Sequence, residues 1–367
     1  MSDFISIHKT GFRLLKMIHS VDSAIIPLHL LEVCFSTIQI YAGLFLTAGL
    51  IDLLLKGAYG QAAQWALYLL GMNLFFGVTL CLLRRKFRGM RNRIWLIFYV
   101  WLREKAFSLD YETMERPEVS EKLLYSERTS EMHGGLGVLL CRYCDILKAL
   151  LNILLSVGMV AVLCMAGPEK QAGLTGWIAK PLPSALLFGA AFAGMLLGSW
   201  KIFGKFAAKQ MAIFSSHTGV ENKISYLQSQ VLGKTETGKI IRIYNMQEMI
   251  LKNITENLEK ACAYYENMCD LERRECDSNK MISSFFTVFS YLLVAVKALT
   301  GAITVGAFTQ FAGVVNQFGN ACLTLIADQG ELRKICTYMG PFLQFLDTEN
   351  LHAAGFHTGG KKNGRGV

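Results

Sequence analysis

The sequence predicts an all-α membrane protein with six long transmembrane helices and helical extensions into the cytosol. Of its 367 residues, 52% are hydrophobic and 18% are charged, whereas a soluble globular chain has about 45–50% apolar and about 25% charged residues. Six apolar runs reach the ~17–25 residues that a helix needs to cross a bilayer. The charged residues gather mainly in two long segments between these runs.

The apolar runs and their connections predict the topology. The second and fourth runs are followed by long charged connections, and the other connections are short. Because both long connections follow even-numbered spans, they lie on the same side of the membrane. We place the six spans at residues 24–55, 62–83, 149–165, 181–203, 281–299 and 305–327, of which the last is the most polar.

Charge indicates which side is the cytosol. A net charge of +9 can indicate a nucleic-acid partner, but 33 of the 37 Lys and Arg residues fall on the side of the long connections and the termini. Membrane proteins carry their excess of Lys and Arg on the cytosolic side. We therefore expect a multi-pass protein of the plasma (inner) membrane with both termini cytoplasmic, membrane lipid as a partner, and no nucleic acid.

The chain divides into three parts. Residues 1–22 mix basic and apolar side chains and predict an amphipathic helix on the inner membrane surface. Residues 23–347 form the six-span transmembrane domain, including two cytosolic helical arms at 84–148 and 201–280. Residues 348–367 are polar and Gly-rich and predict a flexible tail.

The arms are nearly free of helix-breaking residues. Proline breaks helices, and none occurs between Pro27 and Pro117 or between Pro183 and Pro341. We therefore expect the spans to continue into the cytosol as long helices. Pro117 disfavours helical backbone at Arg116, which predicts a change of chain direction in the first arm.

Two stretches in the arms resemble motifs of one family. Leu109–Leu123 (LDYETMERPEVSEKL) is similar to a Leu-Asp-x-x-x-Phe-Glu-Asn-Pro-Glu stretch. Thr237–Ile250 (TGKIIRIYNMQEMI) resembles an Ala-Lys-Glu-Ile-Arg-Leu-Phe/Tyr stretch. Both stretches are found in the six-helix transmembrane domain of ABC exporters of the type I exporter kind. With the six-span frame, the resemblance covers about residues 10–347.

The resemblance implies a membrane-spanning subunit of an ATP-driven exporter. Such a subunit forms the translocation pathway by alternating access, in a dimer with a second copy or a related half-transporter. The two turns would be coupling helices that dock on nucleotide-binding (ATPase) domains. The residues that the resemblance assigns to this coupling are Tyr111, Glu112, Glu115, Pro117, Glu118, Gln228, Val231, Leu232 and Thr235.

The sequence departs from most members of this family because it shows no ATPase. No GxxxxGK[ST] phosphate-binding motif occurs, so we expect no enzymatic activity in this chain, and ATP and Mg²⁺ only on a partner ATPase. That ATPase would be a separate subunit or a domain lost by truncation. Two alternatives are a non-functional or regulatory remnant of a half-transporter and an ion-driven secondary transporter.

Polar side chains at membrane depth are candidates for lining a translocation cavity, because such groups are costly in a bilayer. The candidates are Glu32 in the first span and Gln310, Asn316, Gln317 and Asn320 in the sixth. Asp328, at the inner end of the sixth span, is another acid at this depth. Hydrogen bonding between helices is the alternative role. The transported substrate is unknown.

The cysteines and histidines predict no catalytic or metal site. Cys141 and Cys144 form a lone CxxC without the second pair, or the histidines, that zinc takes. Cys262, Cys269 and Cys276 recur every seven residues on one helix face. We interpret both sets as small side chains buried between helices.

Overall fold

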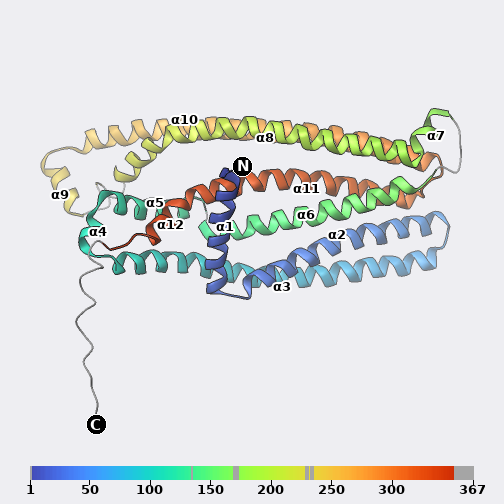
Figure 1. Cartoon of the computed structure of the whole chain (residues 1–367), viewed down its shortest axis with the longest axis horizontal. Helices are drawn as coiled ribbons and strands as arrows, with labels where there is room; N and C mark the ends of the chain where they lie inside the picture. The colour runs from blue at the N-terminus through green and yellow to red at the C-terminus, as the bar shows by residue number, and fades with distance from the viewer. Residues whose placement is uncertain (1, 134, 168–172, 228–230, 232–234, 351–367) are drawn as a thin grey trace, which may run out of the picture. The chain divides into compact units, whose positions relative to one another are not determined.

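The computed structural model is 92% helical. It describes residues 2–133, 135–167, 173–227, 231 and 235–350, and these residues contain no strand. The chain separates into two compact units, which are described one at a time (Figure 1). Unit 1 comprises Met1–Leu182 and Val294–Val367, and unit 2 comprises Pro183–Leu293.

Within the described residues, five helices are long and apolar enough to cross a membrane, and they coincide with the first five predicted spans. They are α2 (Ile25–Leu55), α3 (Tyr59–Ser108), α6 (Gly135–Met165), residues Pro181–Gln210 of α8 (Pro181–Tyr226) and α10 (Gln247–Leu299).

The sixth predicted span is helical but does not join these five. It lies in α11 (Val305–Tyr338), which is not apolar enough to count as a candidate by length and composition. The physical reason is its content of amides and glycines, which lowers its hydropathy. The structure therefore supports five spans where the sequence predicts six.

The predicted continuation of spans into long helices is confirmed. Helix α3 has 50 residues, α8 has 46 and α10 has 53. At 1.5 Å per residue, α3 is roughly 75 Å long, far longer than the ~30 Å hydrocarbon core of a bilayer. A helix of this length that crosses a membrane must also project from it as a stiff rod.

In unit 1, α2, α6 and α11 pack side by side, and α3 lies along α2 (Figure 1). Helix α11 approaches α2 closely at Gly306, where a Cβ atom would overlap the carbonyl oxygen of Ala48. The connections after α2 and α10, which the sequence predicts to be short, contain Gly57 and Gly301, both at φ 75°. This left-handed conformation favours glycine. The connection predicted at 166–180 contains a short helix, α7 (Gly173–Ala179).

The N-terminal amphipathic helix is α1 (Ser2–Val21), and its apolar face packs against the bundle of unit 1. Leu14 and Ile18 are fully buried, whereas Phe12 is exposed. Arg13 Nη1 donates to Asp347 Oδ2 at 2.7 Å, which links α1 to the end of α12 (Gly340–Leu346). This hydrogen bond from the guanidinium lowers the pKa of the Asp347 carboxyl. Both side chains are about half exposed, so the link contributes little stability.

Unit 2 is a pair of long helices, α8 and α10, that lie side by side, with α9 (Thr235–Ile243) between them in the sequence (Figure 1). The rings of Phe192 and Phe286 lie 5.2 Å apart, centroid to centroid, and Gln210 Nε2 donates to Glu275 Oε2 at 2.9 Å. Apolar packing and hydrogen bonding thus both hold the pair together.

The interpretation of the cysteines as buried holds only in part. Cys144 is buried and Cys141 is half-buried, but the three cysteines spaced by seven residues are exposed: Cys262, Cys269 and Cys276. The interpretation of these three cysteines as buried between helices is therefore wrong.

Candidate functional site

Glu32 lies in an ionic contact near the start of α2. Its Oε1 accepts a hydrogen bond from Arg84 Nε of α3 at 2.9 Å, and its Oε2 lies 3.4 Å from His29 Nδ1. The His29 ring stacks on Phe87, with centroids 4.1 Å apart. The Glu32 carboxylate is therefore bound to α3 through Arg84. That Glu32 lines a translocation cavity stays a prediction.

A second ion pair joins α6 to α11. Arg142 Nη1 donates to Asp328 Oδ1 at 2.8 Å, and the Asp328 side chain is only 5% exposed. Among the described residues, neither Asp328 Oδ2 nor Arg142 Nε has a hydrogen-bond partner. Charges inside membrane spans are costly and often mark functional positions. The pair is therefore a candidate functional contact, and sequence reasoning did not find Arg142 as the partner.

None of the four candidate amides of α11 is buried in the helix face that packs against α2 and α6. Asn316 and Asn320 are exposed, and Gln310 and Gln317 are half-buried. By contrast, Phe318 points into unit 1 and is 2% exposed. Amides exposed to lipid would be costly. This face of α11 is therefore suited to a polar cavity or to a second chain.

Glu32 does not join these amides. Leu44 of α2 lies against Gly313 of α11, one turn from Gln317. Glu32 precedes Leu44 by twelve residues, roughly 18 Å along the helix axis. The predicted cavity set thus splits into one acid near the start of α2 and four amides on α11.

A group of hydrogen bonds that sequence reasoning missed crosses the middle of unit 1. The Tyr41 hydroxyl donates to the Asn152 carbonyl oxygen at 2.9 Å and lies 2.8 Å from Ser156 Oγ. Ser156 Oγ in turn donates to the Val314 carbonyl oxygen at 3.4 Å. These contacts connect α2, α6 and α11. A tyrosine and a serine inside apolar runs were the only sequence signal for them.

Asp52 caps the start of α11 from the end of α2. Its Oδ1 accepts from the Gly306 backbone N–H at 2.8 Å, and its Oδ2 accepts from Thr304 Oγ1 at 2.7 Å. Thr304 is itself the N-cap residue of α11 and accepts from the Ala307 N–H. A carboxylate at a helix N-terminus is stabilised by the helix dipole and the free N–H groups. Asp52 therefore fixes the contact between α2 and α11.

Lys297 caps the C-terminus of α6, as Asp52 caps the N-terminus of α11. Its side chain is buried, with 1% of the residue exposed. The ammonium donates to the carbonyl oxygens of Leu163, Cys164 and Ala166 at 2.9, 3.2 and 2.9 Å. These are carbonyls at the C-terminus of α6, where the helix dipole favours a cation. The three donors of the ammonium are thus all used, and the end of α10 is tied to the end of α6.

The turn in the first predicted arm has the geometry that the sequence predicts. Arg116 has an extended backbone, with φ −60° and ψ 127°, directly before Pro117. It separates α4 (Tyr111–Glu115) from α5 (Pro117–His133). The predicted coupling residues here are exposed: Tyr111, Glu112, Glu115, Pro117 and Glu118.

Two contacts hold this turn in place. Asp110 is the N-cap of α4, and its side chain accepts from the Thr113 N–H at 2.8 Å. Asn350 pairs with the backbone on both sides of Leu109: it accepts from the Asp110 N–H at 2.9 Å and donates to the Ser108 carbonyl at 3.0 Å. Sequence reasoning placed Asn350 in a flexible tail and missed this contact.

The second predicted coupling stretch is described only in part. Gln228 and Leu232 lie outside the described residues. Val231 is half-buried, and Thr235 begins α9. A turn with Asn245 at φ 51° then leads into α10. Asparagine tolerates this left-handed conformation better than most residues, so the sequence does encode a reversal here.

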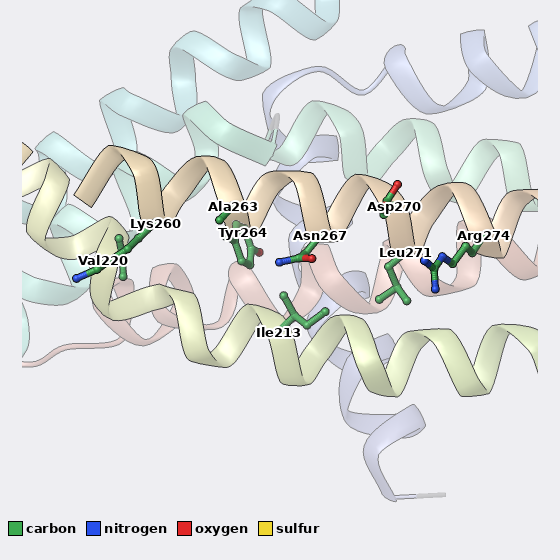
Figure 2. Close-up of a pocket in the computed structure, with 9 residues that line it drawn as sticks. All are labelled: Ile213, Val220, Lys260, Ala263, Tyr264, Asn267, Asp270, Leu271 and Arg274. Carbon is green, nitrogen blue, oxygen red and sulfur yellow. The ribbon is translucent and has the colours of Figure 1, made fainter. Parts of the chain in front are cut away.

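Unit 2 also contains a groove that the sequence did not predict. It lies between the arm portions of α8 and α10 and has a volume of about 560 Å³ (Figure 2). Ile213 and Val220 of α8 face Tyr264, Asn267 and Arg274 of α10 across it. Its described lining residues mix apolar and charged side chains, and no nucleophile–base pair occurs among them.

The comparisons with known proteins identify no family. No family model matches the sequence, and no curated protein is found to be similar to it. In the part of the chain that the structure describes, no three His, Cys, Asp or Glu side chains group as metal ligands would. The chain is an all-helical protein whose five long apolar helices are those of a multi-pass membrane protein.

Proposed function

We propose that this chain is the membrane-spanning subunit of an ATP-driven exporter with the type I ABC exporter fold. It acts in a dimer, with a second copy or a related half-transporter, and moves its substrate by alternating access. A separate ATPase supplies ATP and Mg²⁺ chemistry and docks on the cytosolic turns. Helix α11 serves as the sixth span, and its amide face contributes to the cavity.

One observation carries this proposal. Helix α3 runs without a break from a segment that is long and apolar enough to cross a membrane to an exposed turn directly after its C-terminus. That turn is anchored by Asp110 and Asn350 and presents Tyr111 and Glu115 outward. A continuous helix is stiff, so force applied at such a turn would be transmitted to the membrane.

The test uses the full chain, affinity-tagged and purified from the membranes of the cells that make it. We expect Mg²⁺-dependent ATP hydrolysis to copurify with it, and Tyr111→Ala/Glu115→Ala to reduce this activity about tenfold or more. Glu121→Ala/Leu124→Ala, two exposed positions of α5 in the same arm, is the matched control and should retain the activity. Equal activity in both variants would disprove the coupling role.

An ion-driven secondary transporter is the second candidate. The Arg142–Asp328 pair favours it, because its carboxylate is buried and ionisable pairs at membrane depth serve as proton relays in such carriers. Transport that survives removal of ATP but is abolished by an ionophore would support this candidate over the exporter.

A further inference from the structure

We propose that the exposed face of α3 around Gly89 binds the headgroup of an anionic phospholipid of the inner leaflet. The sequence places six basic residues within 84–93, and no acid occurs between Asp52 and Glu104. No other ten-residue stretch of the chain contains six Lys or Arg residues. The proposal rests on α3 crossing the membrane with its basic segment on the cytosolic side, and it is independent of any ATPase partner.

The six basic residues divide into two groups. Arg84 pairs with Glu32, and Arg91 is half-buried with its Nη1 3.8 Å from Cys141 Sγ, so both turn toward unit 1. The other four are exposed and form no ion pair with any described residue: Arg85, Lys86, Arg88 and Arg93. These four cations are therefore open to a soluble or lipid anion.

Gly89 lies at the centre of this exposed group. On a helix, residues three and four positions apart are neighbours, so Gly89 is flanked by Arg85, Lys86, Asn92 and Arg93. A Cβ atom at Gly89 would meet nothing within 4 Å. The glycine therefore leaves an open notch in the helix surface, ringed by three cations and an amide. Such groups bind phosphate oxygens through charge-assisted hydrogen bonds.

The surroundings of the notch favour a lipid over a free anion. Leu82 and Val78 lie on the same face of α3, two and three turns before Gly89, and are 61% and 54% exposed. They belong to the predicted span, so acyl chains would lie against them while the headgroup reaches the notch. Clusters of Lys and Arg directly cytoplasmic of a span attract anionic lipids.

The general excess of positive charge on the cytosolic side does not by itself explain this arrangement. That rule counts charges in connecting segments. It does not require the charges to lie on one helix face or to surround a glycine. The two explanations differ in one respect that can be measured. A general charge effect depends on net charge, whereas the notch depends on position.

The experiment titrates the purified full chain in detergent with phosphatidylglycerol or phosphatidylcholine and counts bound lipids by native mass spectrometry. We expect the wild-type chain to prefer phosphatidylglycerol and Arg85→Gln/Arg93→Gln to reduce that preference at least threefold. Lys239→Gln/Lys252→Gln removes the same charge from exposed positions of α9 and α10 and should leave the preference unchanged. Gly89→Leu keeps every charge, suits a helix, and should reduce the preference by covering the notch.

Three outcomes would overturn the proposal. The first is an unchanged preference in both Arg85→Gln/Arg93→Gln and Gly89→Leu. The second is an equal loss in the control variant, which would indicate net charge alone. The third is full displacement of the lipid by millimolar inorganic phosphate, which would indicate a site for a free anion.

Discussion

Lys297 shows how one side chain decides a helix contact. A lysine is rarely fully buried, yet here the ammonium satisfies three carbonyl groups at the end of α6. Helix C-termini leave their last carbonyls without intrahelical partners. The lysine is therefore both a cap for α6 and the link that ties the end of α10 to it.

Replacing this lysine should destabilise the protein. Lys297→Met keeps much of the apolar stem but removes the charged donor that three carbonyl oxygens share, and we expect a loss of about 1–3 kcal/mol in the free energy of unfolding. Thermal unfolding in detergent, followed by the helical signal in circular dichroism, measures the change. Lys252→Met, at an exposed position of α10, is the control. Equal melting temperatures for both variants would show that the cap is not stabilising.

At the scale of elements, the contact between α2 and α11 is set by small residues and one carboxylate. Gly306 and Gly313 allow the helices to approach, with Ala48 and Leu44 directly opposite. Asp52 then holds the start of α11. This contact gives α11, which is not apolar enough to count as a candidate span, a fixed place beside α2, which is.

A larger residue at Gly306 should separate these two helices. In Gly306→Val, the side chain would collide with the Ala48 carbonyl and with the Asp52 carboxylate, and overpacking of this kind costs about 1–3 kcal/mol. The same thermal unfolding assay measures it. Gly158→Ala in α6 is the control, because its Cβ would meet nothing within 4 Å and alanine favours helix by about 1 kcal/mol over glycine. Gly306→Val that melts no lower than the control would contradict the close approach.

At the scale of the whole molecule, the topology depends on whether α11 crosses the membrane as a sixth span. The structure gives five candidates by length and composition, whereas the alternation of short and long connections requires six. A sixth crossing keeps both termini on the cytosolic side, in agreement with the distribution of Lys and Arg.

Cysteine labelling of intact cells tests this topology. In a chain with its ten native cysteines replaced, we expect a membrane-impermeant maleimide to label Lys56→Cys and Val305→Cys but to label Lys239→Cys and Arg333→Cys only after permeabilisation. All four positions are exposed, so access depends on the side of the membrane alone. Labelling of Arg333→Cys in intact cells would show that α11 does not cross, and labelling of Lys239→Cys would reverse the sidedness of the second arm.

The sequence alone determined the features that depend on near neighbours along the chain. Apolar runs specify the long helices, and the absence of proline lets them continue into the arms. Pro117 forces an extended backbone on Arg116, which ends α4. Each of these follows from the conformational preferences of a residue and its immediate neighbours. Local pattern also indicated the amphipathic character of α1, which the buried Leu14 and Ile18 confirm.

Only the tertiary structure decided which polar groups meet. Arg142 and Asp328 are 186 positions apart, Asp52 and Gly306 are 254 apart, and Asn350 and Asp110 are 240 apart. No local pattern encodes such pairs, because helix packing brings them together after the helices have formed. For the same reason the sequence grouped Glu32 with the amides of α11, whereas packing placed its carboxylate on Arg84 of α3.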